Sequence, residues 1–203
     1  PRSAFSIRSR TRLRAKNENY GDRSRGTGKC GCLDLSPGHA HNVALMLLAQ
    51  ISDPHITRPE QPLDRLFETS VNLERAVAHI KNLTTTPDVV LITGDCVDEG
   101  TVEEYAAFRN LLRPLEMPVY VIPGNHDNRE NMREAFGEQG TGHHDEFIQY
   151  VVNVGSIRLI ALDTHIPNSP SGELCHSRLG WLDERLDENQ TIPTIIFQHH
   201  PPF

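Results

Sequence analysis

Short apolar runs alternate with helical segments along most of this sequence, and that alternation restricts the fold more than any other feature. Each apolar run is five to seven residues long, which suits a buried strand. Helices that separate strands are typical of an α/β fold, so we expect parallel pairing in the first half of the domain. Two β-rich runs on either side of Val154 and Gly155 predict a hairpin. The expected strands are 46–52, 88–93, 118–122, 147–153, 156–162 and 193–198, and the expected helices are 66–83, 101–112, 128–136 and 178–188.

Two of the expected helices have clear sequence signals. Thr101 and Glu104 stand three residues apart at the start of the 101–112 segment, which predicts a capping box. The 66–83 segment has apolar residues at helical spacing and is followed by Pro87, which cannot continue a helix. Its apolar positions are Val71, Ala76, Val77 and Ile80.

The first 45 residues differ in composition from the rest of the chain. They carry nine basic and three acidic residues, a net charge of +6, whereas the other 158 residues carry 11 basic and 24 acidic residues, a net charge of −13. We expect 1–45 to be a disordered basic tail or a non-native upstream segment, because it lacks an apolar pattern that could offset its ordering entropy. A nucleic-acid-binding arm and a transit peptide are the less favoured alternatives. Met46 stands at the start of the first expected strand, so we place the domain at 46–203.

Composition excludes several classes of protein. No run of 18 apolar residues occurs, so we expect no membrane-spanning helix. The four cysteines are too few for a disulfide framework, and Cys30 and Cys32 are spaced poorly for a structural zinc site. We therefore expect a reducing compartment and a cytoplasmic protein.

Polar residues follow four of the expected strands. In an α/β sheet such residues meet at the carboxyl edge, where ligands bind. Clustered carboxylates need a compensating cation, and a set of oxygen and imidazole donors favours Mn, Fe, Zn or Co. Gly-Asn-His-Asp, at 124–127, is expected only about 0.003 times by chance in this composition. The candidate metal ligands are Asp53, His55, Asp95, Asn125 and His199, and the candidate catalytic residue is His126.

Each candidate also has a simpler structural interpretation. His55 would cap the end of a strand, and Asp95 would stabilise a tight turn through its side chain. We interpret Asp127 as a partner that orients His126, and Asp163 as a further support of the site. The remaining polar and aromatic candidates are assigned structural roles: His165, His143 and His144 as surface loop residues, Cys96 as a small buried residue, and Trp181 as core.

The order of these motifs resembles the calcineurin-like metallophosphoesterase family. Ile-Ser-Asp-x-His at 51–55 and His-His-Pro-Pro at 199–202 look most like bacterial class III cyclic-nucleotide phosphodiesterases and the related glycerophosphodiesterases. The serine/threonine phosphatase branch is disfavoured, because it typically has Gly-Asp-x-x-Asp-Arg-Gly and Gly-Asn-His-Glu. This chain has Asp98-Glu99-Gly100 after Gly94-Asp95, and Gly-Asn-His-Asp at 124–127. The resemblance implies a four-layer sandwich of two mixed β-sheets flanked by helices, with two metal ions at one edge. Matched residue by residue, Asp53 and His55 would hold the first metal, Asp95 would bridge both, Asn125 and His199 would hold the second, and His126 would face the leaving group.

The chain departs from the family pattern at its end. A Gly-His-x-His motif completes both metal shells in the family, and none occurs here; Gly142-His143-His144 has the wrong spacing. We therefore expect a C-terminally incomplete domain that holds metals weakly. A non-catalytic fragment with a partial metal site is the alternative to an enzyme.

The resemblance implies hydrolysis of a phosphodiester, either a cyclic nucleotide such as cAMP or a glycerophosphodiester. Two cations about 3.5–4 Å apart would hold a bridging hydroxide that attacks phosphorus. The expected partner is a small-molecule phosphodiester, with no membrane, nucleic acid disfavoured and a homodimer left open.

Overall fold

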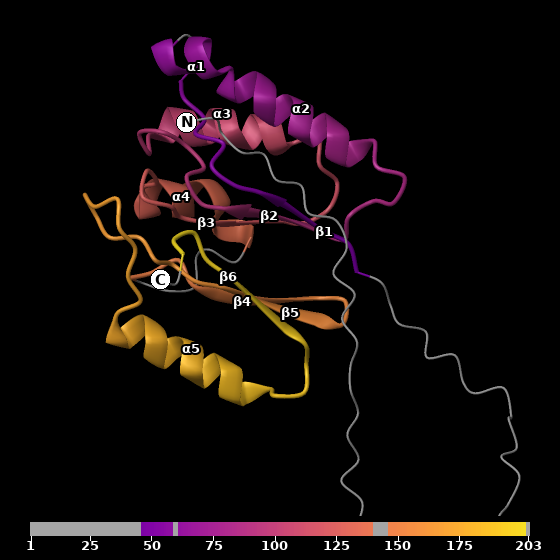
Figure 1. Cartoon of the computed structure of the whole chain (residues 1–203), viewed down its shortest axis with the longest axis vertical. Coiled ribbons are helices and arrows are strands. Elements are labelled where there is room, and N and C mark those ends of the chain that lie inside the picture. The colour runs from indigo at the N-terminus through magenta and orange to yellow at the C-terminus, as the bar shows by residue number, and fades with distance from the viewer. Residues whose placement is uncertain (1–45, 59–60, 140–145, 202–203) are drawn as a thin grey trace, which may run out of the picture.

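The computed structural model of the protein describes residues 46–58, 61–139 and 146–201. Two β-sheets are stacked, and helices cover the outer side of each sheet, which gives four layers (Figure 1). The sandwich architecture expected from the sequence motifs is therefore confirmed. The predictions for 1–45, and those for His143 and His144, lie outside the described residues.

The first sheet contains three strands in the order β1-β2-β3, and all its pairs are parallel. Val90 in the central strand lies opposite Ala49 on one side and Val119 on the other. The parallel pairing expected in the first half of the domain is thus confirmed. The strands are β1 (Leu48–Ile51), β2 (Val89–Thr93) and β3 (Val119–Ile122), and the helices are α1 (Pro62–Phe67), α2 (Thr69–Lys81), α3 (Val102–Leu112) and α4 (Arg129–Phe136), with the 3-10 turn η1 (Gly137–Gln139).

The second sheet contains β4 (Tyr150–Val154), β5 (Ile157–Ala161) and β6 (Thr194–Phe197). It is mixed, because β5 pairs antiparallel with β4 and parallel with β6. The expected hairpin joins β4 to β5, with Gly155 in its turn at a φ of +57°. Helix α5 (His176–Glu188) covers the outer face of this sheet (Figure 1).

The apolar runs became strands because the centre of each sheet is enclosed on both faces. All five residues of β2 and all five of β5 are buried. The two sheets also share a hydrogen bond, since the Tyr150 hydroxyl donates to the carbonyl oxygen of Val121 at 2.6 Å. Burial on both faces removes the need for alternating polar residues, which explains the continuous apolar sequence.

The helices confirm some sequence signals and correct others. Thr101 and Glu104 form the expected capping box of α3. The single helix expected over 66–83 is instead two helices, because Glu68 adopts a left-handed φ of +51° between them. Val71 is 38% exposed rather than buried, since the buried stripe of α2 runs through Leu73, Ala76, Val77 and Ile80. No helix in the described ranges is both long and apolar enough to cross a membrane.

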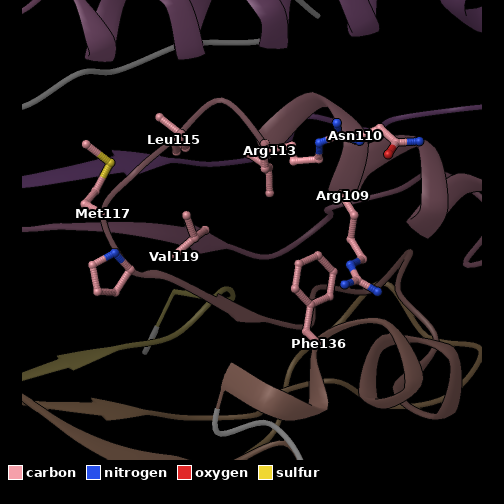
Figure 2. A pocket seen from close by; sticks show the side chains of 9 residues that line it. Arg109, Asn110, Arg113, Leu115, Met117, Val119 and Phe136 are labelled. Carbon is pink, nitrogen blue, oxygen red and sulfur yellow. The ribbon is translucent and has the colours of Figure 1, made fainter.

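A pocket of about 300 Å³ lies beside the start of β3 (Figure 2). The end of α3 contributes Arg109 and Arg113, and the approach to β3 contributes Met117 and Val119. The polar loop at 124–127 follows the opposite, carboxyl end of the same strand. This pocket is therefore separate from the polar cluster described next.

Candidate metal centre

The loops after β1 and β2 bring three of the candidate ligands together in a left-handed backbone conformation. The φ angles are +56° at Asp53, +43° at His55 and +49° at Asp95. Such angles are uncommon outside glycine, although Asp and His tolerate them better than most residues. The amides of Asp53 and His55 donate to the carbonyls of Gly94 and Asp95, at 3.2 and 3.0 Å, which holds the two loops side by side. Backbone strain of this kind is concentrated at functional sites.

Asp95 lies at the centre of the cluster and is 5% exposed. Its Oδ2 is 3.4 Å from His55 Nε2, and its Oδ1 is 3.6 Å from His199 Nε2. Asp53, His55 and Asp95 each offer a ligand atom, and these atoms lie within 4.8 Å of one another. Oδ1 also accepts a hydrogen bond from the His126 amide at 3.0 Å, which ties the loop after β3 to this carboxylate.

His199 reaches the cluster from the second sheet, at the end of β6. Its Nδ1 is 2.8 Å from the carbonyl oxygen of Thr93, so Nδ1 carries the proton and donates. Nε2, the nitrogen nearer Asp95, is then left with a free lone pair. This is the tautomer that a metal-binding histidine needs, with a carbonyl fixing the orientation of the ring.

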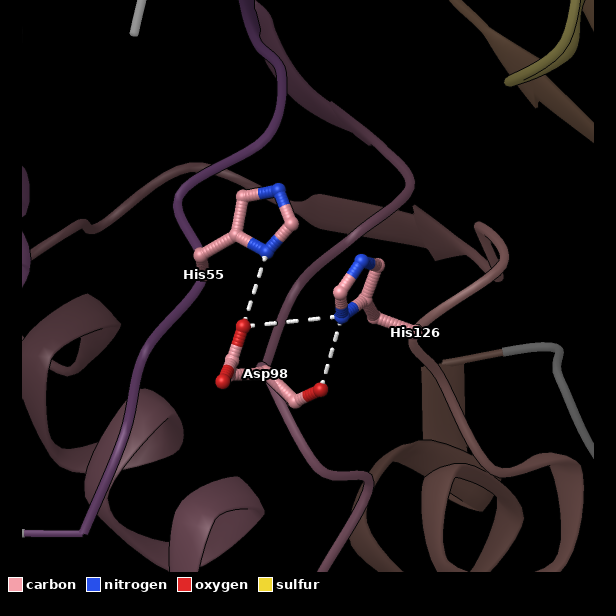
Figure 3. A group of neighbouring side chains, drawn as sticks. All are labelled: His55, Asp98 and His126. Carbon is pink, nitrogen blue, oxygen red and sulfur yellow. Dashed lines mark hydrogen bonds and ion pairs between the residues drawn. The ribbon is translucent and has the colours of Figure 1, made fainter. Parts of the chain in front are cut away.

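A second group contains His55, Asp98 and His126, which come from three different loops (Figure 3). Asp98 Oδ1 is 3.4 Å from His55 Nδ1 and 3.5 Å from His126 Nδ1. His126 Nδ1 also donates to the main-chain carbonyl of Asp98 at 2.8 Å. Sequence reasoning missed Asp98 as a site residue, although its place three residues after Asp95 in the same loop was the available signal.

Asn125 and His126 lie at the rim of the cluster. Asn125 is half-buried, His126 is exposed, and both line a pocket of about 520 Å³ beside α4. Among the described residues, the structure therefore groups Asp53, His55, Asp95 and His199 tightly. Asn125 lies next to them in the loop that hydrogen-bonds to Asp95.

Asp127 does not orient His126, so that sequence-based interpretation is wrong. Its Oδ2 accepts from the amides of Gly124 and Cys96, at 2.8 and 3.1 Å, and its Oδ1 accepts from the Tyr105 hydroxyl at 2.8 Å. The carboxylate is 4% exposed and fastens the loops after β2 and β3 to α3. Asp98 contacts the His126 ring instead. The prediction that Cys96 is a small buried residue is confirmed, since it is 0% exposed.

Burial raises the pKa of the Asp127 carboxyl from 3.8 to about 6, against the lowering effect of its hydrogen bonds. Between about pH 4 and pH 6 the folded state therefore binds more protons than the unfolded state. The stabilising contribution of this group is complete below that window and is lost as the pH rises through 6.

We expect the difference in Tm between the metal-free wild type and metal-free Asp127→Asn (wild type minus variant) to decrease between about pH 4 and pH 7. Thermal unfolding of both proteins in chelator checks this prediction, and a difference that stays constant with pH would contradict it.

Asp163, which the sequence suggested as a support of the site, lies just after β5 and is bound to α4. It is fully buried and accepts two hydrogen bonds from the Arg129 guanidinium of α4, at 2.6 and 2.9 Å.

The expectation that His165 is a surface loop residue is wrong, because it is 7% exposed. Arg129 and Arg178 both donate to its main-chain carbonyl, at 2.6 and 3.1 Å, and this holds the loop inward. Trp181, expected in the core, is half-buried on α5.

Two glycines are needed because the cluster packs directly against the backbone. A Cβ on Gly94 would lie 2.4 Å from His199 Nδ1, and one on Gly124 would lie 2.2 Å from Asp95 Oδ1. Gly94 also has a φ of +91°, which L side chains rarely adopt. The glycines of both motifs therefore allow the histidine and the carboxylate to approach the chain closely.

We expect Gly94→Ala to lower the free energy of unfolding by about 3 kcal/mol, and the Tm by about 10 °C, through overpacking and strain. Gly180→Ala is the matched control, because Gly180 lies in α5 and a Cβ there would meet no heavy atom within 4 Å. It should raise stability by about 0.5–1 kcal/mol. Thermal unfolding of both variants checks the prediction, which fails if the two substitutions have similar effects.

The donor chemistry of the cluster suits divalent cations. Carboxylate oxygens and imidazole nitrogens lie together, and the His199 tautomer leaves Nε2 free. Without a cation, Asp53 and Asp95 place two carboxylates in one group, which is unfavourable where water is scarce. These residues therefore fit a metal ion.

Comparison with known proteins agrees with this geometry. The calcineurin-like phosphoesterase family matches residues 46–203. A probable glycerophosphodiester phosphodiesterase, GpdQ, of Arcobacter nitrofigilis is 37% identical over 157 residues, which are 77% of this chain and 58% of that protein. The 3′,5′-cyclic adenosine monophosphate phosphodiesterase CpdA of Pseudomonas aeruginosa is 31% identical over 159 residues, 78% of this chain and 56% of that protein.

A probable cyclic nucleotide phosphodiesterase of a Synechococcus species is 33% identical over 165 residues, 80% of this chain and 61% of that protein. The chain thus spans somewhat more than half the length of these relatives. The family match begins at Met46, where the described structure begins, and includes every candidate ligand. On the strength of that match, the chain belongs to the calcineurin-like phosphoesterase family.

Proposed function

We propose that the protein is a metal-dependent phosphodiesterase that acts on a small-molecule phosphodiester. The observation that carries this proposal is the position of Asp95 between His55 and His199, with His126 hydrogen-bonded to the same carboxylate. Carboxylate and imidazole donors at one sheet edge suit a pair of cations, and a catalytic group stands next to them. The names of similar proteins point to cyclic nucleotides such as cAMP and to glycerophosphodiesters as candidate substrates.

Two cations are the proposed cofactors, of the Mn, Fe, Zn or Co type. Asp53 and His55 would hold one, Asn125 and His199 would hold the other, and Asp95 would contact both. When bound, such cations supply Lewis-acid activation of water and of the phosphoryl oxygens. The protein supplies the positioning: the Gly94 and Asp95 carbonyls fix the Asp53 loop, and the Thr93 carbonyl fixes the His199 ring.

His126 is the proposed general acid for the leaving alcohol. Its Nδ1 proton is already donated to the Asp98 carbonyl, at 2.8 Å, so a proton given to the substrate must come from Nε2. The Asp98 carboxylate, 3.5 Å from Nδ1, holds the ring in that orientation. Proton transfer to the departing oxygen lowers the barrier because an alkoxide is otherwise a poor leaving group.

Metal removal tests the proposal. We expect chelation to lower hydrolysis of bis(p-nitrophenyl) phosphate by at least about tenfold, with recovery on addition of Mn²⁺, Co²⁺ or Zn²⁺. Metal content is measured in parallel, and hydrolysis of p-nitrophenyl phosphate serves as the monoester comparison. Turnover that persists without metal would refute the proposal. Metal binding with no turnover of any ester would instead support the alternative of a non-catalytic chain with a partial metal site.

A further inference from the structure

A pocket of about 520 Å³ lies beside His126 and extends beyond the metal cluster. Glu130 and Arg133 of α4 form one wall, and Asn168 in the loop after β5 forms a second wall. His126 and Asn125 also line it. The pocket therefore opens directly from the residue that we propose to protonate the leaving group.

The two walls are fastened to each other. Arg129 of α4 donates to the Asp163 carboxylate and to the His165 carbonyl, both in the segment after β5. On the loop side, the Ser169 amide donates to the Ile166 carbonyl at 3.2 Å, and Asn168 adopts a left-handed φ of +59° in that turn. The pocket is thus formed before any ligand binds, which reduces the ordering cost of recognition.

The lining of the pocket is polar. Among the described residues that line it, all except Pro167 have a polar or charged side chain, and none is Phe, Tyr or Trp. A nucleobase is usually held by stacking on aromatic side chains, whereas hydroxyl groups are held by amide and carboxylate hydrogen bonds. His165 also lines the pocket, and its buried Nδ1 has no hydrogen-bond partner in the described structure.

We infer that this pocket binds the leaving alcohol of the substrate, and that it selects a small hydroxylated alcohol over an aromatic one. The inference rests on the proposed function, because it assumes that the bond broken is the one next to His126. Glu130 and Asn168 are the specificity-determining residues that we assign. Both are exposed and line the pocket, Glu130 from α4 and Asn168 from the loop after β5, and neither belongs to the metal-ligating groups.

The test compares two symmetrical diesters, so that the identity of the leaving group is unambiguous. Glycerophosphoglycerol releases glycerol, and bis(p-nitrophenyl) phosphate releases an aromatic alcohol. We expect the double variant Glu130→Ala/Asn168→Gly to lower kcat/KM for glycerophosphoglycerol by about tenfold, through lost hydrogen bonds. The aryl diester should change by less than about twofold. Glycine is used at position 168 because it tolerates the left-handed φ.

Glu134→Ala is the matched control. It removes the same charge from the same helix, one turn further on, at a residue that does not line this pocket. It should leave both substrates unchanged. Equal losses on the two substrates in the double variant, or an equal selective loss in Glu134→Ala, would overturn the inference.

A binding measurement tests the pocket independently of hydrolysis, and so independently of the proposed function. Ligand-observed NMR with glycerol on the metal-free protein should show saturation transfer for the wild type and Glu134→Ala, and a clear loss for the double variant. If no diester is hydrolysed while glycerol binding follows this pattern, the proposed function and the leaving-group role fail, but the pocket is still shown to bind a hydroxylated alcohol. If hydrolysis occurs but glycerol binds equally to all three proteins, the pocket assignment fails alone.

Discussion

Asp95→Asn is expected to lower hydrolysis of bis(p-nitrophenyl) phosphate by at least about 1,000-fold and to reduce the bound metal. Changing a group outside the ligand shell already costs about 10–100-fold in metal affinity or activity, so losing the carboxylate that we propose to contact both cations should cost more. The fold should persist, because asparagine tolerates the left-handed backbone and its Oδ1 can still accept from the His126 amide. Metal analysis and turnover measure the two effects.

Two controls accompany this variant. Asp127→Asn alters an equally buried carboxylate that contacts Gly124, Cys96 and Tyr105 rather than His55 or His199. It should retain more metal and more activity than Asp95→Asn. Asp183→Asn removes the same charge from the exposed face of α5 and should change neither quantity. Wild-type metal content in Asp95→Asn would show that this residue does not bridge two cations.

His126→Asn is expected to have an effect that depends on the leaving group. Hydrolysis of glycerophosphoglycerol should fall by about 1,000-fold, within the range of general acid catalysis, because the departing alkoxide needs a proton. Bis(p-nitrophenyl) phosphate should lose only about tenfold, since p-nitrophenolate departs well without one. The asparagine amide can replace Nδ1 as a donor to the Asp98 carbonyl, so the loop should keep its shape.

Metal content decides between two roles for His126. We expect it to equal that of the wild type, because His126 is assigned to the leaving group rather than to a cation. His55, Asp98 and His126 also form a group with ligand atoms within 4.8 Å. Loss of metal in His126→Asn, with equal activity losses on both diesters, would therefore identify His126 as a ligand and not as the acid.

The sequence alone was enough to predict the strands and the place where the polar residues meet, although not the break between α1 and α2 at Glu68. Short continuous apolar runs such as Val89–Thr93 are typical of buried strands in an enclosed sheet, and the helices between them favour parallel neighbours. Once parallel pairing is given, the residues after β1, β2 and β3 must share one edge. Sheet topology therefore suffices to group Asp53, His55 and Asp95, and the three side chains do lie together.

The sequence could not predict side-chain contacts that depend on the path of a loop. Asp98 lies beside His55 and His126 only because the loop after Asp95 folds back, through the hydrogen bond from the Asp98 amide to the Ile56 carbonyl. Asp127 adjoins His126 in sequence, yet its side chain points to Tyr105, because the buried hydroxyl and two amides needed an acceptor.

The inward position of His165 has the same kind of origin. Residues that follow a strand are usually exposed, and nothing in the local sequence shows that two arginines from α4 and α5 will both donate to the His165 carbonyl. Hydrophobic periodicity is a local property of the sequence, and parallel pairing brings the strand ends to one edge of the sheet. The sequence by itself therefore determined the fold class and the edge at which the site lies. The partners of buried polar groups are chosen by residues far apart in the chain, so only the tertiary structure decided which side chain faces which.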